Sequence, residues 1–305
     1  MIVFKKLAEL ILLFFGYVKL EEILRIHQFP KSVINNFIES NKIKFLIFKK
    51  KSKFIKYKSF KQIKKEISKK DYVFDISINE LKFKMNFDGY PINGAISERI
   101  DGEREEQTTA ILCSLLEPGN NVLEIGSCYG YFTNIISDII KDNGKLIAIE
   151  GTPNNYKILK NNIDINKLNN TKSYNYFIDN NFDNSSIYFN TNDTNPYAAE
   201  SYDSNKFFKE DLIDKIEVKK ILLSDFLDKI NFFPEFIFMD IEGYELQVIE
   251  DLFNSRFSFK PKYILFEIHN QFYPKEKPLD YLLNIISEND YSYSMIDDKI
   301  LCKLN

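Results

Sequence analysis

The sequence has little of what builds a disulfide framework, a zinc centre or a membrane span. Its three cysteines, Cys113, Cys128 and Cys302, show no C-x-x-C spacing and leave an odd count, which argues against disulfides and a zinc site and favours a reducing cytosol. The apolar run of residues 10–15 is too short to cross a bilayer, which needs ~20 apolar residues. No small-residue cleavage site follows this run, so we expect a cytoplasmic chain.

Acidic residues are scarce in the first 70 positions. This segment has 18 lysines and arginines against five glutamates and no aspartate, a net charge of +13, which leaves −16 for the rest of the chain. Thirteen of the lysines lie between residues 42 and 70, interleaved with phenylalanine and tyrosine. Such a segment can bind anionic lipid headgroups, nucleic acid or an acidic glycan, or it can be a solvated helical face with aromatic anchors in the core.

We expect residues 1–70 to form a basic, mostly helical arm. Residues 4–20 can be a helix packed on the catalytic domain or on a second subunit, or an in-plane membrane anchor, and a further helix covers 21–28 before Pro30. We expect no nucleic acid partner. Peripheral contact with an anionic membrane, at its inner face, stays open, and so does the oligomeric state.

The stretch that organises the chain is 121–133, NVLEIGSCYGYFT. An apolar strand, buried on both faces, breaks at a turn with glycines at 126 and 130 and continues as a helix-like pattern. A dinucleotide fingerprint would need glycine two residues after Gly126, where Cys128 stands. What remains is an acid, Glu124, two residues before one glycine and six before the next. A β-branched side chain at 126 would occupy the place of a ligand.

Two later stretches continue this pattern. Residues 144–150 form a second apolar strand that ends in Glu150, at the distance where doubly wound folds place the acid that binds ribose hydroxyls. Residues 236–245, FIFMDIEGYE, form a strand closed by three carboxylates around a glycine, and 263–269, YILFEIH, form another strand that ends at His269. Four ordered motifs are far more specific than any one of them.

In this order, the motifs resemble the FkbM family of S-adenosylmethionine-dependent methyltransferases, over residues 100–305. The resemblance implies a Rossmann-like class I methyltransferase sheet of α/β type with an antiparallel last strand. It also implies that S-adenosyl-L-methionine is bound by the turn and the two acidic strand ends, that is by Glu124, Gly126, Ser127, Tyr129, Gly130, Glu150 and Asp240. Two departures from the family pattern are Cys128, where asparagine is common, and Met239, where lysine is common.

The alternation of elements predicts one domain over 71–305. It begins with a hairpin at 71–86, which we expect to cap an edge of the main sheet, and a helix at 103–116. We then expect a helix at 154–165, strands at 174–178 and 216–222, a short helix at 223–227, and a final hairpin of 291–296 with 299–304. An insertion at 180–209 is either a substrate lid with Tyr197 and Tyr202 or a surface excursion.

Methyl transfer to a hydroxyl needs a base or a metal, because the pKa of a hydroxyl lies far above 7. Of the two histidines, His27 lies in the basic arm and His269 at a strand end, so we predict His269 as the base with Asp240 as its partner. A divalent cation such as Mg²⁺ on Asp240 and Glu267 is compatible with the sequence, although no spacing demands it. Glu242 and Glu245 are either functional or merely the acidic start of a helix.

The sequence thus predicts an enzyme (EC 2.1.1) that carries out O-methylation, and the resemblance implies a sugar hydroxyl of a glycan or glycosylated natural product as acceptor. Two alternatives stay open: a nicotinamide-dependent oxidoreductase and a non-catalytic cofactor-binding or membrane-scaffold protein.

Overall fold

The computed structural model describes residues 17–19, 46–48, 52–56, 73–87, 99–100, 105–179, 186–190, 213–254 and 259–305. The chain divides into two compact units, residues 1–106 and 107–305. The helix predicted at 21–28, most of the insertion, and Tyr197 and Tyr202 lie outside the described residues. So does the helix predicted at 4–20, except for residues 17–19, where the prediction was wrong because they form a strand.

The described part of the basic arm is strand, contrary to the mostly helical prediction. Its three strands form an antiparallel sheet in the order β1-β3-β2; they are β1 (Tyr17–Lys19), β2 (Leu46–Phe48) and β3 (Ser52–Lys56). Each carries β-branched or aromatic residues, which favour extended backbone, and these outweighed the lysine-rich pattern that we had interpreted as a helical face.

The first unit also contains the predicted hairpin, which is formed by β4 (Val73–Ile78) and β5 (Leu81–Asn86). The rings of Phe74 and Phe87 lie 6.0 Å apart. Within the described residues, β4 and β5 pair with each other as a separate two-stranded sheet and add no strand to the main sheet. That the hairpin caps an edge of the main sheet stays a prediction.

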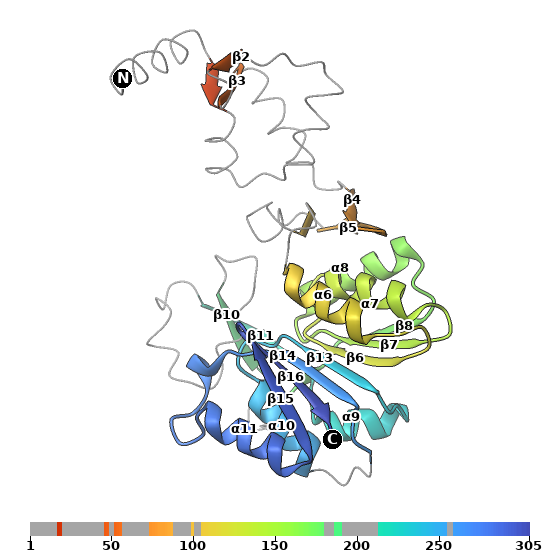
Figure 1. The fold of residues 1–305 in the computed structure, drawn as a ribbon, viewed down its shortest axis with the longest axis vertical. Coiled ribbons are helices and arrows are strands. Elements are labelled where there is room, and N and C mark those ends of the chain that lie inside the picture. Colours follow the sequence, from red (N-terminus) through yellow and green to blue (C-terminus); the bar gives the residue numbers. More distant parts are fainter. Residues whose placement is uncertain are drawn as a thin grey trace. The chain divides into compact units, whose positions relative to one another are not determined.

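The second unit is built on a seven-stranded sheet in the order β15-β16-β14-β13-β6-β7-β8 (Figure 1). Five neighbouring strands are parallel: β6 (Asn121–Ile125), β7 (Lys145–Ile149), β8 (Thr171–Tyr174), β13 (Phe236–Met239) and β14 (Tyr263–Glu267). Strand β16 (Lys299–Leu304) runs antiparallel to both β14 and β15 (Tyr291–Ile296). This mostly parallel sheet confirms the predicted α/β class.

Helices cover both faces of the sheet. One side carries α6 (Glu106–Leu115), α7 (Tyr131–Ile140) and α8 (Pro153–Asn166), and the other carries α9 (Leu223–Ile230), α10 (Glu245–Asn254) and α11 (Leu279–Glu288) (Figure 1). The parallel strands are therefore buried on both faces, which explains their continuous apolar sequences. Alternate residues face opposite helices: Leu123 and Ile125 join the core with α9 and α10, whereas Glu124 bonds to α7.

Between β8 and β13 the chain makes two small pairings. Strand β9 (Phe177–Ile178) runs parallel to β12 (Lys220–Ile221), and β10 (Ser186–Asn190) runs antiparallel to β11 (Ile213–Glu217). The strand predicted at 174–178 is thus divided at Asn175, whose amide donates to the carbonyls of Glu150 and Gly151 and turns the chain. In the described part of the chain, no helix is long and apolar enough to cross a bilayer.

Candidate active site

The predicted cofactor turn follows β6 directly. Gly126 and Ser127 both donate their N–H groups to the Ile149 carbonyl, at 2.9 and 3.0 Å, which ties the turn to the end of β7. Gly126 and Gly130 have φ of +87° and +86°, a region that glycine adopts without strain, and Cys128 shares it at 49°. Gly130 is the N-cap of α7, so the turn places the N-terminus of this helix beside the sheet.

The packing of the protein itself requires glycine at position 126. A Cβ atom at this position would lie 2.0 Å from the Asp240 carbonyl oxygen, and the Asp240 N–H donates to the Ile125 carbonyl at 3.1 Å. We had expected a larger residue at 126 to occupy the cofactor's place. The structure shows that it would first collide with the backbone after β13. The cofactor turn and Asp240 are therefore in direct contact.

Two buried carboxylates support the turn. Glu124, 1% exposed, accepts a 2.5 Å hydrogen bond from the Thr133 hydroxyl, and burial outweighs this bond and raises the pKa of Glu124 to about 7. Glu150 accepts from the Cys128 N–H at 2.9 Å and from the Thr152 N–H and hydroxyl at 2.8 and 2.7 Å. Burial also raises the pKa of Glu150, against these bonds.

Glu150 thus joins the turn to the start of α8. Because each carboxylate oxygen has two lone pairs, these three bonds fill Oε1 and leave one lone pair on Oε2 for a ligand hydroxyl. Tyr129 differs from the prediction in one respect: its side chain is 1% exposed and lies in the core. Only its backbone, whose carbonyl accepts from the Asn162 amide, belongs to the turn.

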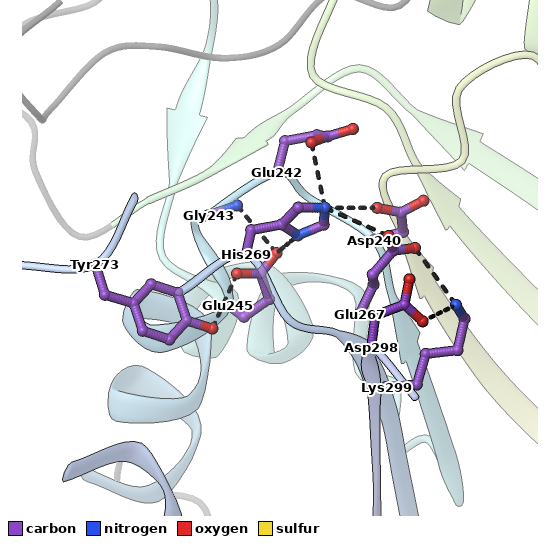
Figure 2. Close-up of polar contacts among 9 residues, drawn as sticks. All are labelled: Asp240, Glu242, Gly243, Glu245, Glu267, His269, Tyr273, Asp298 and Lys299. Atoms are coloured by element: carbon purple, nitrogen blue, oxygen red, sulfur yellow. Dashed lines mark hydrogen bonds and ion pairs between the residues drawn. The ribbon is translucent and has the colours of Figure 1, made fainter. Parts of the chain in front are cut away.

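Four carboxylates, including that of Asp240, surround one histidine (Figure 2). His269 follows β14, and its Nδ1 lies 2.9 Å from Glu245 Oε1. Its Nε2 lies 3.2 Å from Glu242 Oε2, 3.7 Å from Glu267 Oε1 and 4.0 Å from Asp240 Oδ1. The end of β13, the start of α10 and the end of β14 therefore bring these side chains to one edge of the sheet, as predicted for Asp240 and His269.

Glu245 is fully buried and fixes the imidazole ring. Its Oε1 also accepts from the Gly243 N–H at 3.0 Å, and its Oε2 accepts from the Tyr273 hydroxyl at 3.1 Å. The environment raises the pKa of Tyr273, through burial first and then through Glu245. Glu245 begins α10, so it is the acidic start of a helix, which was one of the two alternatives. Its contact with His269 is compatible with the other alternative, a functional role, which stays a prediction.

The charge state of His269 follows from its neighbours. Burial alone would lower its pKa, but the hydrogen bond and charge of Glu245, together with the charges of Glu242 and Asp240, outweigh burial and raise the pKa to about 9. At neutral pH the ring therefore carries a proton on each nitrogen unless another cation takes its place. A doubly protonated imidazole accepts no proton, which disfavours the predicted base role in this state.

Sequence reasoning missed the cation at the other end of the cluster. Lys299, 5% exposed, lies 2.7 Å from Asp298 Oδ1 and 3.7 Å from Glu267 Oε2 (Figure 2). Lys299 holds the pKa of Asp298 below its usual range, although burial acts in the opposite direction. The antiparallel pairing of β16 with β14 sets Lys299 opposite Glu267. Predicting this register from the sequence would have revealed the contact.

The fold and this edge define a class of protein, an α/β methyltransferase with a cofactor turn after its central strand. The model described as "Methyltransferase FkbM domain" matches residues 124–293, more than half of the chain. The chain belongs to the FkbM methyltransferase family, and it is an S-adenosylmethionine-dependent methyltransferase. A second model, protein-L-isoaspartate(D-aspartate) O-methyltransferase, matches residues 42–180.

Similar solved structures are distant. A precorrin-6y C5,15-methyltransferase from Geobacter metallireducens is 11% identical with a TM-score of 0.40, covering 66% of this chain and 90% of that one. A fibrillarin from Methanococcus jannaschii is 13% identical with a TM-score of 0.41, covering 75% and 80%. Aeropyrum pernix fibrillarin, with natively bound S-adenosyl-L-methionine, is 14% identical with a TM-score of 0.37, covering 65% and 74%. No curated protein matches the chain.

Proposed function

We propose that this methyltransferase acts on oxygen, and that its acceptor is a sugar hydroxyl of a glycan or glycosylated natural product. The observation that carries the proposal is the contact between the cofactor turn at Gly126 and Asp240, which is the first residue of the carboxylate–histidine cluster. Carboxylate oxygens accept hydrogen bonds from hydroxyl groups. A polyhydroxylated acceptor therefore finds several partners beside the methyl group.

The reaction is an in-line displacement. The acceptor oxygen forms a bond to the methyl carbon, the bond from that carbon to sulfur breaks, and its electron pair neutralises the sulfonium. The hydroxyl proton must leave, and because the His269 ring is already protonated near neutral pH, we assign its removal to a carboxylate of the cluster. The chief contribution of the protein is alignment, since the cofactor already carries a good leaving group.

The acceptor is tested with ¹³C-methyl-labelled S-adenosylmethionine. The purified protein is incubated with glycans extracted from cells that lack it, and mass spectrometry and NMR locate the label. We expect a labelled methyl ether on a sugar carbon. The Asp240→Asn variant should lose the label yet retain binding of S-adenosylhomocysteine in calorimetry. Label on nitrogen, or on protein side chains only, would refute the sugar hydroxyl.

Cofactor binding is tested separately at Glu150. We expect Glu150→Ala to weaken S-adenosylhomocysteine binding by about 1.5–3 kcal/mol, because a charge-assisted bond to the ribose is lost. The matched control is Thr152→Val, which removes one donor to Glu150 but leaves the carboxylate in place. Equal affinities for wild type and Glu150→Ala would remove Glu150 from the cofactor site.

A further inference from the structure

The orientation of His269 fixes which of its nitrogens carries hydrogen. The buried Glu245 carboxylate already accepts hydrogen bonds from the Gly243 N–H and the Tyr273 hydroxyl. It therefore also acts as an acceptor toward the imidazole ring. Nδ1 therefore donates to Glu245 Oε1 over 2.9 Å. In a neutral ring, Nε2 then carries a lone pair and no hydrogen, because neutral imidazole has one N–H.

In the neutral ring, this lone pair would point at other acceptors. Nε2 faces carboxylate oxygens of Glu242, Glu267 and Asp240 at 3.2, 3.7 and 4.0 Å. Within the described residues, the Nδ1 contact is the only hydrogen bond of the imidazole, and His269 is 7% exposed. A buried nitrogen that faces carboxylates across these distances requires a positive charge between them. That charge is either a proton or a metal ion.

The net charge of the cluster favours a divalent metal ion over a single proton. Four carboxylates, of Asp240, Glu242, Glu245 and Glu267, lie no more than 4.0 Å from the ring nitrogens. The cation Lys299 is shared between Asp298 at 2.7 Å and Glu267 at 3.7 Å, so it balances at most one of these carboxylates. One additional proton on the ring leaves the cluster strongly negative, whereas a divalent ion adds two charges at the point where the ligand atoms converge.

We propose that Asp240, Glu242 and His269 bind a divalent first-row transition-metal ion. Their ligand atoms all lie within 4.8 Å of one another, so small side-chain movements allow one ion to contact all three at ~2.0–2.2 Å. Two carboxylates with an imidazole suit Mn²⁺ and its neighbours, whereas Mg²⁺ prefers oxygen ligands and retained water. Glu245 is the carboxylate that orients a metal-bound histidine through its other nitrogen.

Such an ion would explain how the acceptor loses its proton without a histidine base. Asp240 contacts the cofactor turn through Gly126, so an ion on its side chain lies beside the methyl group. A bound hydroxyl becomes more acidic because the ion stabilises the alkoxide. This role rests on the proposed O-methylation, but binding of the ion does not.

The test is a Mn²⁺ titration of the full-length protein after dialysis against EDTA and removal of the chelator. Electron paramagnetic resonance of free Mn²⁺ counts the ions bound. We expect one ion per chain, with affinity at least tenfold weaker in His269→Gln and in Glu242→Gln. The matched control is Asp225→Asn, which changes an exposed carboxylate of α9 and should bind as wild type does. Thermal unfolding by circular dichroism identifies which variants are folded.

The outcomes separate this proposal from the proposed function. No stoichiometric binding by the wild-type protein, or equal binding by folded His269→Gln and Glu242→Gln variants, would overturn the metal site. Methyl transfer to a hydroxyl at full rate by the metal-free protein would overturn the role of the ion and leave O-methylation intact. Stoichiometric binding that depends on His269 and Glu242 supports the site, even if no hydroxyl acceptor is found and O-methylation fails.

Discussion

One backbone contact joins the predicted cofactor turn to the edge of the sheet that carries Asp240 and His269. Gly126 has φ of +87°, and its missing side chain lets the Asp240 carbonyl come to 2.0 Å from where a Cβ would be. The two halves of the site meet here because β6 and β13 are neighbours in the sheet. Any side chain at 126 must therefore separate these two strand ends.

Gly126→Ala should destabilise the protein by roughly 2–5 kcal/mol, from left-handed strain together with the backbone collision. Urea unfolding followed by circular dichroism measures the loss. The control is Gly119→Ala, where φ is +100° but the nearest atom is the flexible Asn143 side chain at 3.0 Å, and we expect about 1–2 kcal/mol there. Similar losses at both positions would argue against the collision.

Glu124 predicts a dependence of stability on pH. Burial raises its pKa from 4.5 to about 7, so the folded chain holds this proton more tightly than the unfolded chain does. The resulting stability is fully present below pH 4.5, is lost as pH rises toward 7, and changes little above that.

Glu124→Gln should therefore gain stability relative to wild type as pH rises from about 4.5 to 8, by about 3 kcal/mol. Urea unfolding across this range measures the difference. The exposed carboxylate variant Glu217→Gln serves as control. A pH-independent difference between wild type and Glu124→Gln would show that Glu124 is ionised in the folded protein throughout.

Among the secondary-structure elements, the short pairing of β9 with β12 is stabilised by a buried ion pair. Lys220 Nζ lies 2.9 Å from Asp179 Oδ2, and both side chains are 4% exposed. Strand β12 pairs through only two residues, so backbone hydrogen bonds alone hold it weakly. The ion pair therefore matters for the position of the segment that leads back to α9.

Lys220→Met should cost about 3–5 kcal/mol, because Asp179 would stay buried without its ammonium partner. Asp179→Leu combined with Lys220→Met should recover most of this loss, since neither charge is then buried. A double-mutant cycle in urea gives the coupling energy. Additive losses from the two single variants would mean that the pair contributes no coupling to stability.

At the scale of the whole molecule, charge is divided along the chain, +13 over residues 1–70 and −16 over the rest. An anionic membrane would attract the first segment and repel the second, so we propose that the arm directs the enzyme to anionic lipid. Attraction of this kind contributes about 1 kcal/mol per lysine near the surface and weakens with salt.

Co-sedimentation with vesicles should therefore show binding to phosphatidylserine-containing membranes that is lost in pure phosphatidylcholine. Reversal of Lys49, Lys50 and Lys51 to glutamate should weaken binding by roughly 3 kcal/mol or more. Reversal of three exposed lysines in the second unit, Lys145, Lys160 and Lys172, should leave it unchanged. Equal binding to neutral vesicles would contradict an electrostatic attachment.

Local sequence signals are sufficient to specify the central βα units. Apolar runs bounded by glycine and acid identify buried strands and their turns without any long-range information, which is why 121–125, 145–149, 236–239 and 263–267 were predicted closely. Glu150 was found because it ends such a strand. Where lysines are mixed with apolar residues, as in 52–56, the same local signals misled, since amphipathic helices and strands share them.

The contacts within the cluster depend on tertiary structure. Glu245 begins α10, whereas His269 and Tyr273 flank the 3₁₀ turn that follows β14. Their hydrogen bonds therefore depend on how α10 packs against the end of β14. Lys299 reaches Glu267 through the antiparallel register of β16. The charge of the imidazole follows from distances to four carboxylates, and electrostatic energy depends on distance and burial, which a linear spacing of residues does not contain.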